Sequence, residues 1–154
     1  MTTRILLLED DFLQRSDVKG TLEREFDAEV LALSCEKEFR DRFESVAEQP
    51  PSVAVLDIML RWANASREES AQPEDATDPA KAGIRCARML RSDGRTKDVR
   101  VILYSVLGKN SLAELLPEGI PSLEKEHDYE NLIEAVKDAL IERTNPAPHK
   151  EVLH

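Results

Sequence analysis

Hydrophobic residues along the chain gather in short unbroken runs, and segments with helical spacing of apolar positions separate these runs. An unbroken apolar run of four to six residues is too short for a buried helix and is typical of a strand covered on both faces. Residues 5–8 form such a run and predict a strand, and four further segments of strand character are predicted over residues 28–33, 52–57, 99–104 and 119–124. Pro121 has no N–H to donate to a neighbouring strand, so the last strand is expected at an edge of the sheet.

Apolar residues recur every three or four positions between these runs, which predicts helices. The predicted helices cover residues 13–25, 34–49, 83–92, 111–116 and 129–143. Ser34 is expected to cap the second of them and Gly94 to end the third. Strands that alternate with helices predict right-handed crossovers, and therefore an α/β fold with a five-stranded parallel sheet and helices on both faces.

Residues 61–82 interrupt this alternation, because they show no strand pattern and little helical spacing. They are predicted to form a long loop, and loops of this length are usually functional or disordered. A lid over a functional site and an inert insertion both remain open for this loop. Trp62 within it either covers such a site or docks onto a partner. Residues 1–143 are predicted to form one domain, followed by a tail or truncated linker at 144–154.

Composition narrows the classes of function. The 154 residues carry a formal charge of −10, which argues against nucleic acid as a partner because DNA and RNA binding requires a basic surface. The N-terminal apolar run is too short for a signal peptide or a membrane span. Cys35 and Cys86 lack the spacing of a zinc site, so we expect reduced, packed thiols in a cytoplasmic protein.

Polar residues stand where four of the predicted strands end. These residues are Glu9 and Asp10, Asp57, Ser105 and Lys125. Since the carboxyl ends of parallel strands meet at one edge of a sheet, we expect them to lie close together.

Acidic side chains in such a group repel one another unless a cation lies between them, and oxygen-rich ligation with retained waters is what Mg²⁺ favours. Asp57 is then a candidate nucleophile for a phosphoryl group, with a hydrogen bond from Ser105 and the charge of Lys125 to stabilise it. Taken singly, each residue also has an ordinary explanation: a polar loop for Glu9 and Asp10, a turn hydroxyl for Ser105, a surface amine for Lys125.

Together these positions resemble the receiver domains of two-component response regulators. The resemblance rests on Arg4–Asp11, on Asp57-Ile58-Met59-Leu60, and on Ser105 and Lys125 in the family's order. It implies a flavodoxin-like, doubly wound fold and phosphorylation of Asp57 by a histidine kinase or phosphotransfer protein.

The resemblance also implies a Mg²⁺ site. Asp10, Asp57 and the backbone carbonyl of Met59 would bind the ion directly, and Glu9 would act through water. Such a protein is a phosphoacceptor in signalling and not an enzyme. Its output would pass through contacts with a downstream protein that the sequence does not identify, and homodimer formation is left open.

The chain departs from the family pattern at several positions. The glycine that begins the third helix stands 26 positions after Asp57 (83 − 57), where the family has about eight, so roughly 18 residues are inserted. Val106 stands where the family has a small residue, Ser122 where it has an aromatic one, and Glu126 where it has proline. We therefore expect a trans peptide bond before Glu126.

These departures support an alternative, a receiver-like scaffold that binds a partner protein whatever the state of Asp57. A phosphatase with an aspartate nucleophile is a third reading. Met59 argues against it, because those enzymes have a second aspartate at that position.

Overall fold

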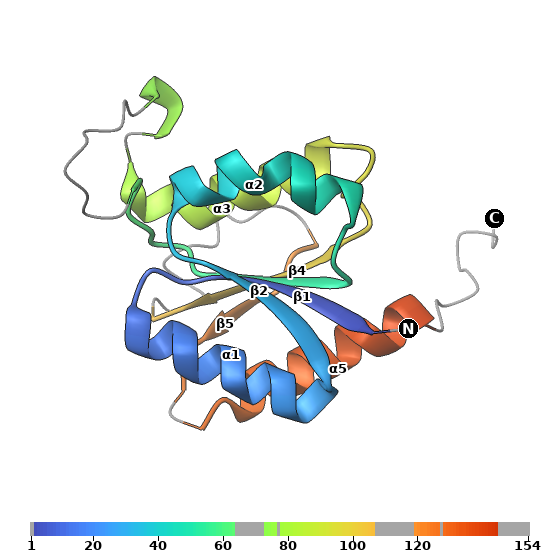
Figure 1. Cartoon of the computed structure of the whole chain (residues 1–154). Helices are drawn as coiled ribbons and strands as arrows, with labels where there is room; N and C mark the ends of the chain where they lie inside the picture. The colour runs from blue at the N-terminus through green and yellow to red at the C-terminus, as the bar shows by residue number, and fades with distance from the viewer. Residues whose placement is uncertain (1, 64–72, 77, 107–118, 127, 145–154) are drawn as a thin grey trace.

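A computed structural model describes residues 2–63, 73–76, 78–106, 119–126 and 128–144 of the chain. The predicted helix at 111–116 and most of the predicted tail at 144–154 lie outside these residues. Within them the chain forms a central sheet between two layers of helices (Figure 1).

The sheet has five parallel strands, as predicted: β1 (Thr3–Leu8), β2 (Ala28–Leu33), β3 (Val53–Leu56), β4 (Arg100–Ser105) and β5 (Ser122–Glu124). Their order in space is β2-β1-β3-β4-β5, the order of the flavodoxin-like fold, and β5 is an edge strand as Pro121 indicated. The strand order reverses beside β1 and β3. Ligand sites in sheets of this kind form at the carboxyl ends of the strands next to such a reversal.

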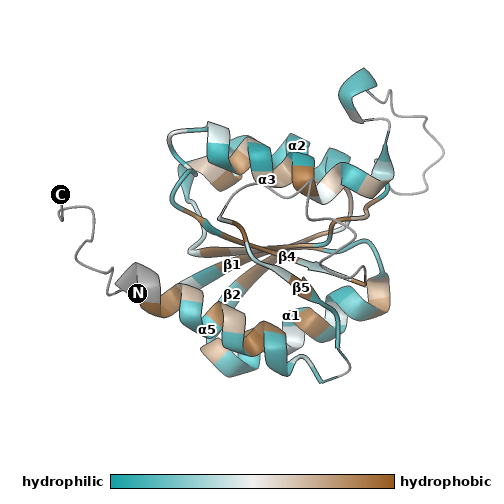
Figure 2. Ribbon diagram, turned by 180° about the vertical axis from the view of Figure 1, so that it is seen from behind, coloured by the Kyte–Doolittle hydropathy of each residue, from teal (hydrophilic) through white to brown (hydrophobic). Residues whose placement is uncertain are grey.

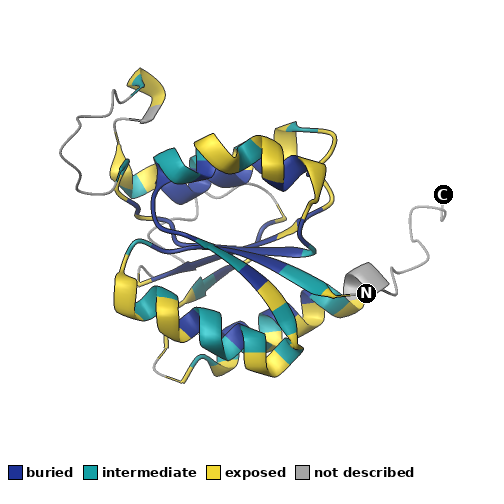
Figure 3. Ribbon diagram, in the orientation of Figure 1, coloured by how far each residue is buried: buried dark blue, intermediate teal, exposed yellow. Residues whose placement is uncertain are grey.

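Four described helices cover the sheet: α1 (Phe12–Phe26), α2 (Glu36–Glu48), α3 (Ala82–Ser92) and α5 (Glu130–Thr144). Helices α2 and α3 lie on one face, and α1 and α5 lie on the other (Figure 1). Neighbouring residues of a strand point to opposite faces, so Leu6 and Leu8 pack on the α2 and α3 side while Ile5 and Leu7 pack on the other. Apolar and buried residues accordingly follow the middle of the sandwich (Figures 2 and 3).

Two predicted helix caps are wrong by one residue. The N-cap of α2 is Cys35, because Ser34 lies further out and donates from its N–H and Oγ to Glu38 Oε1 at 2.7 and 3.1 Å. Helix α3 ends at Ser92, and Asp93 takes an extended backbone there. Gly94 does not adopt a left-handed backbone conformation, and the described glycine with positive φ is Gly119.

Smaller expectations can be compared with the described residues as well. The predicted loop is irregular where it is described, apart from the short 3₁₀ turns η1 (Glu74–Ala76) and η2 (Pro79–Lys81). Cys35 and Cys86 are buried and unpaired with each other, and the peptide bond before Glu126 is trans. Among the described helices, none combines the length and the apolar character that crossing a membrane requires.

Candidate functional site

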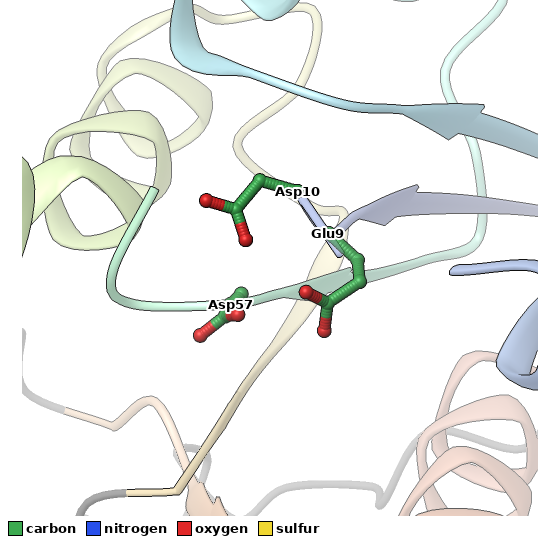
Figure 4. Close-up of side chains that lie close together, drawn as sticks. All are labelled: Glu9, Asp10 and Asp57. Carbon is green, nitrogen blue, oxygen red and sulfur yellow. The ribbon is translucent and has the colours of Figure 1, made fainter. Parts of the chain in front are cut away.

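Three carboxylates meet at the carboxyl ends of β1 and β3. Glu9 and Asp10 directly follow β1, and Asp57 directly follows β3. The two strands are neighbours with Leu8 beside Leu56, so the residues after them also lie side by side. Each of the three side chains offers an oxygen within 4.8 Å of the other two, and the close-up shows them gathered around one space (Figure 4).

Lys125 reaches the carboxylates from the edge strand β5. It follows β5, and its backbone N–H donates to the carbonyl of Ser105 at 2.8 Å. Its Nζ donates to Glu9 Oε1 at 2.6 Å, to Asp57 Oδ2 at 3.1 Å and to Gln14 Oε1 at 2.8 Å. One ammonium group thus bridges two carboxylates that come from different strands.

Gln14 is a site residue that the sequence did not reveal. It lies in the first turn of α1, where Asp11 caps the helix by accepting a hydrogen bond from the backbone N–H of Gln14 at 2.9 Å. From this position the side chain of Gln14 accepts a hydrogen bond from Lys125. The acidic stretch after β1 therefore has two tasks, since Glu9 and Asp10 line the site and Asp11 starts the helix that supports Lys125.

Asp57 is almost completely buried, with 8% of its surface exposed. The pKa of Asp57 is raised from 3.8 to about 7, because burial, the largest cause, and the negative charge of Glu9 together outweigh the opposing charge of Lys125. Burial by itself lowers the pKa of Lys125, but the charges of Asp57 and Glu9 outweigh it and the pKa of Lys125 is raised. A single ammonium does not neutralise the group of acids.

The residues present fit a magnesium ion. Three carboxylates on two neighbouring strands supply closely spaced oxygen atoms, the donor type that Mg²⁺ binds, and the group has surplus negative charge. Glu9, Asp10 and Asp57 are the residues that would hold it. Met59, whose backbone carbonyl the resemblance adds as a ligand, follows two residues after Asp57 with its side chain 43% exposed.

Ser105 is the last residue of β4 and is fully buried. Because Leu56 pairs with Leu103, Ser105 stands just beyond Asp57 on the neighbouring strand. Val106, which follows it, is 63% exposed. The predicted residues from four strands are thus brought to one edge of the sheet.

Ser122 and Tyr104 lie on opposite faces of the sheet. Ser122 is buried beside Leu103, which packs on the face of α2 and α3, and its Oγ has no hydrogen-bond partner among the described residues. Tyr104 packs into the core beneath α1 and α5, with Lys125 Nζ 5.8 Å from the centre of its ring. Tyr104 is therefore a packing residue and cannot take the place of an aromatic side chain at position 122.

Gly83 brings the end of the long loop back to the site. Its N–H donates to the carbonyl of Ile58 at 2.8 Å, and a Cβ at this position would lie 2.0 Å from the carbonyl oxygen of Asp57. Only glycine fits so close to the backbone that carries Asp57. The start of α3 thus contacts the Asp57 turn directly, although the inserted residues separate the two in the sequence.

The first residues of the loop bind to α2. The N–H groups of Glu36 and Lys37 donate to the carbonyls of Arg61 and Trp62 at 3.2 and 2.7 Å, and the guanidinium of Arg40 lies 5.4 Å from the Trp62 ring. Trp62 therefore docks this segment onto a helix of its own chain.

Glu36 is a buried charge that joins this segment to α3. Its side chain is 1% exposed and accepts two hydrogen bonds from Arg85, at 2.6 and 2.9 Å, and one from Arg40 at 2.9 Å. Arg40 also contacts Asp75 of η1 at 3.2 Å. Sequence patterns show Glu36 only as an acidic residue in the first turn of a helix, so its burial was not foreseen.

No protein-family model matches the chain, and no curated protein matches it. Solved structures do resemble it. They include a sensor protein from Polaromonas sp. JS666, with a TM-score of 0.66 and 23% identity, over 90% of this chain and 95% of that one. They also include a response regulator receiver protein from Sinorhizobium medicae, with a TM-score of 0.66 and 22% identity, over 92% and 97% of the two chains.

A third similar structure is the response regulator TrrA from Thermotoga maritima in complex with Mg²⁺ and beryllium fluoride. It has a TM-score of 0.66 and 21% identity, over 90% of this chain and 99% of that one. The structural neighbours across nearly the whole chain are thus receiver domains of response regulators. At this level of identity the similarity establishes the fold.

Proposed function

We propose that this chain is a receiver domain that accepts a phosphoryl group on Asp57, with Mg²⁺ bound, from a histidine kinase or phosphotransfer protein. The observation that carries the proposal is the meeting of Glu9, Asp10 and Asp57 with Lys125 at the strand ends of a β2-β1-β3-β4-β5 sheet. The fold shared with receiver domains supports it, and one of these, TrrA, binds Mg²⁺ and beryllium fluoride.

In the proposed reaction a carboxylate oxygen of Asp57 attacks the phosphorus atom of the donor. A bond forms between that oxygen and phosphorus, the bond between phosphorus and the donor breaks, and the donor leaves with the electron pair. Bound Mg²⁺ supplies positive charge that offsets the negative oxygens of the phosphoryl group.

The chain's own residues have distinct parts in this proposal. Asp57 is the nucleophile, and Glu9 and Asp10 hold the ion together with Asp57 and the Met59 carbonyl. Lys125 already contacts Asp57 at 3.1 Å and can move its charge to a phosphoryl oxygen, and Ser105 would donate a hydrogen bond to another. The product is an acyl phosphate that serves as a signal, so the chain does not turn over a substrate.

Incubation with acetyl phosphate tests the proposal. With Mg²⁺ present, intact mass measurement is expected to show one added phosphoryl group on the wild-type protein. EDTA and the Asp57→Asn substitution should each abolish it. A wild-type protein that gains no mass, or an adduct that persists in Asp57→Asn, would count against the proposal.

The cellular location and the partner proteins follow from the same proposal. We place the protein in the cytoplasm, where such kinases expose their phosphorylated histidine, and we expect output through contact with a downstream protein. The kinase and the downstream protein are defined only by these roles. Among the described residues Val106 is exposed beside the site and is available for such contacts.

A second candidate function is a scaffold that binds its partner whatever the state of Asp57. The observation in its favour is Ser122, which is a small, buried side chain. The resemblance to receiver domains would place an aromatic residue at this position. Partner affinity measured with and without acetyl phosphate and Mg²⁺ separates the two functions. Affinity that changes on phosphorylation and is insensitive in Asp57→Asn would exclude the scaffold.

A further inference from the structure

Arg61, the first residue of the long loop, contacts Asp10 in two ways. Its backbone N–H donates to Asp10 Oδ2 at 3.3 Å, and its side-chain Nε lies 3.6 Å from the same oxygen. Asp10 is 51 positions away in the sequence, and its side chain is 24% exposed. The loop therefore places a guanidinium directly on one of the three carboxylates of the site.

The backbone that presents Arg61 is held in place. The N–H of Glu36 donates to the carbonyl of Arg61, and the N–H of Lys37 donates to that of Trp62 at 2.7 Å. Leu60 is also tied, since its N–H donates to the carbonyl of Pro79 at 3.1 Å. Hydrogen bonds on both sides of Arg61 thus fix where its side chain starts, even though the guanidinium itself is half exposed.

The two cations of the site divide the carboxylates between them. Lys125 contacts Glu9 and Asp57, and Arg61 contacts Asp10. A divalent ion on Asp10 would stand close to the Arg61 guanidinium, and like charges at such distances repel. The guanidinium also lies 3.6 Å from one of the two oxygens through which Asp10 could bind the ion.

We propose that Arg61 is a built-in competitor of the metal ion: it neutralises Asp10 in the metal-free protein and lowers the affinity of the site for Mg²⁺. The inference rests on the proposed function, because it concerns the same ion. Arg61 acts through Asp10 and is a positioning residue. The long loop then has an effect on the chemistry at Asp57 through its first residue, independent of the rest of its length.

The test is Arg61→Gln, which removes the charge and leaves the backbone N–H to Asp10 in place. Isothermal calorimetry gives the Mg²⁺ dissociation constant, and the fluorescence of Trp62, the single tryptophan, is followed in the same titration. Loss of one exposed ion pair should tighten Mg²⁺ binding about threefold to fivefold at low salt. The gain should shrink in high salt, because exposed charges are screened.

Arg4→Gln is the matched control. It removes the same charge from a side chain 39% exposed at the opposite end of β1, where Arg4 lies 3.9 Å from Glu29. Its Mg²⁺ affinity should equal that of the wild type.

The outcomes separate the inference from the proposed function. Equal affinities of wild type and Arg61→Gln, weaker binding in Arg61→Gln, or an equal gain in Arg4→Gln would each overturn the inference while leaving the Mg²⁺ site intact. A wild-type protein that shows no saturable binding of Mg²⁺ by calorimetry would refute the proposed function, and the inference with it.

Discussion

Replacing Asp57 with asparagine should stabilise the metal-free protein. Asp57 is 8% exposed, lies beside Glu9, and has its pKa raised from 3.8 to about 7, so its ionised form is costly in the folded state. Asparagine has nearly the same shape and no charge, and its oxygen can still accept a hydrogen bond from Lys125. A residue that is expected to perform the chemistry is thus expected to weaken the fold.

The expected gain in the free energy of unfolding follows from the raised pKa of Asp57. A difference of about three pKa units corresponds to about 4 kcal/mol at pH values where Asp57 is ionised in both states. Glu9 shares the repulsion and can relax when Asp57 is neutral, so we expect a gain of about 2–4 kcal/mol at pH 8.

The raised pKa of Asp57 also determines how the stability of the wild type changes with pH. Between pH 4 and pH 7 the folded protein binds a proton at Asp57 that the unfolded chain has lost, so wild-type stability falls as pH rises through this range. Above pH 7 the carboxyl is ionised in both states and its contribution is constant. The advantage of Asp57→Asn should therefore be full above pH 7 and disappear progressively between pH 7 and pH 4.

Urea unfolding followed by circular dichroism, in EDTA from pH 4 to pH 8, measures this difference. Asp41→Asn is the control, because Asp41 is an exposed carboxylate on α2 paired with Lys37, and its loss should cost at most about 0.5 kcal/mol. A lower stability of Asp57→Asn than of wild type at pH 8 would show that the buried charge of Asp57 does not weaken the fold. A gain of the same size at every pH would show the same, since the charge of Asp57 would then not be its cause.

Three further substitutions test the packing and charges around the site, each by urea unfolding. Lys125→Met should destabilise the protein by about 3 kcal/mol at pH 8, because it leaves Glu9 and Asp57 buried without their shared cation; an unchanged midpoint would contradict the bridge. Gly83→Ala should cost at least about 1–3 kcal/mol, since the added methyl group overlaps the backbone of Asp57, and a neutral result would show that α3 does not pack there. Glu36→Gln should cost about 3 kcal/mol by leaving Arg85 without its buried partner, and a loss below 0.5 kcal/mol would mean that water replaces this pair.

The sheet could be predicted because most of its strands are short segments rich in apolar residues, with the unbroken runs Ile5–Leu8 and Val53–Leu56 at its centre, and such runs are typical of strands that are buried on both faces. The strand-end residues Glu9, Asp10 and Asp57 followed from the same pattern, since a parallel sheet brings the carboxyl ends of its strands to one edge. Local sequence patterns therefore predicted most of the candidate site. The one further rule needed was that ligands bind at the carboxyl ends of parallel strands.

Contacts that join distant segments could not be predicted in this way. Arg61 and Asp10 are 51 positions apart, and Glu36 and Arg85 are 49 apart, so no local pattern pairs them. In the sequence Gln14 looks like an ordinary residue of a helical turn, and only the structure shows its hydrogen bond with Lys125.

The helix caps failed for a different reason. Ser34 and Gly94 are residue types that suit helix caps, but each lies one position away from the cap that the backbone adopts. Contacts with neighbouring side chains, such as the one between Ser34 and Glu38, decide between such positions.

Phosphorylation of Asp57 is best tested by locating the phosphoryl group on the chain. After incubation with acetyl phosphate and Mg²⁺, reduction with borohydride converts an aspartyl phosphate to homoserine, which peptide mass spectrometry assigns to one position. Phosphorylation of Asp57 should give homoserine at position 57 alone, dependent on phosphodonor and Mg²⁺. An unmodified Asp57, or homoserine at Asp10 in its place, would contradict it.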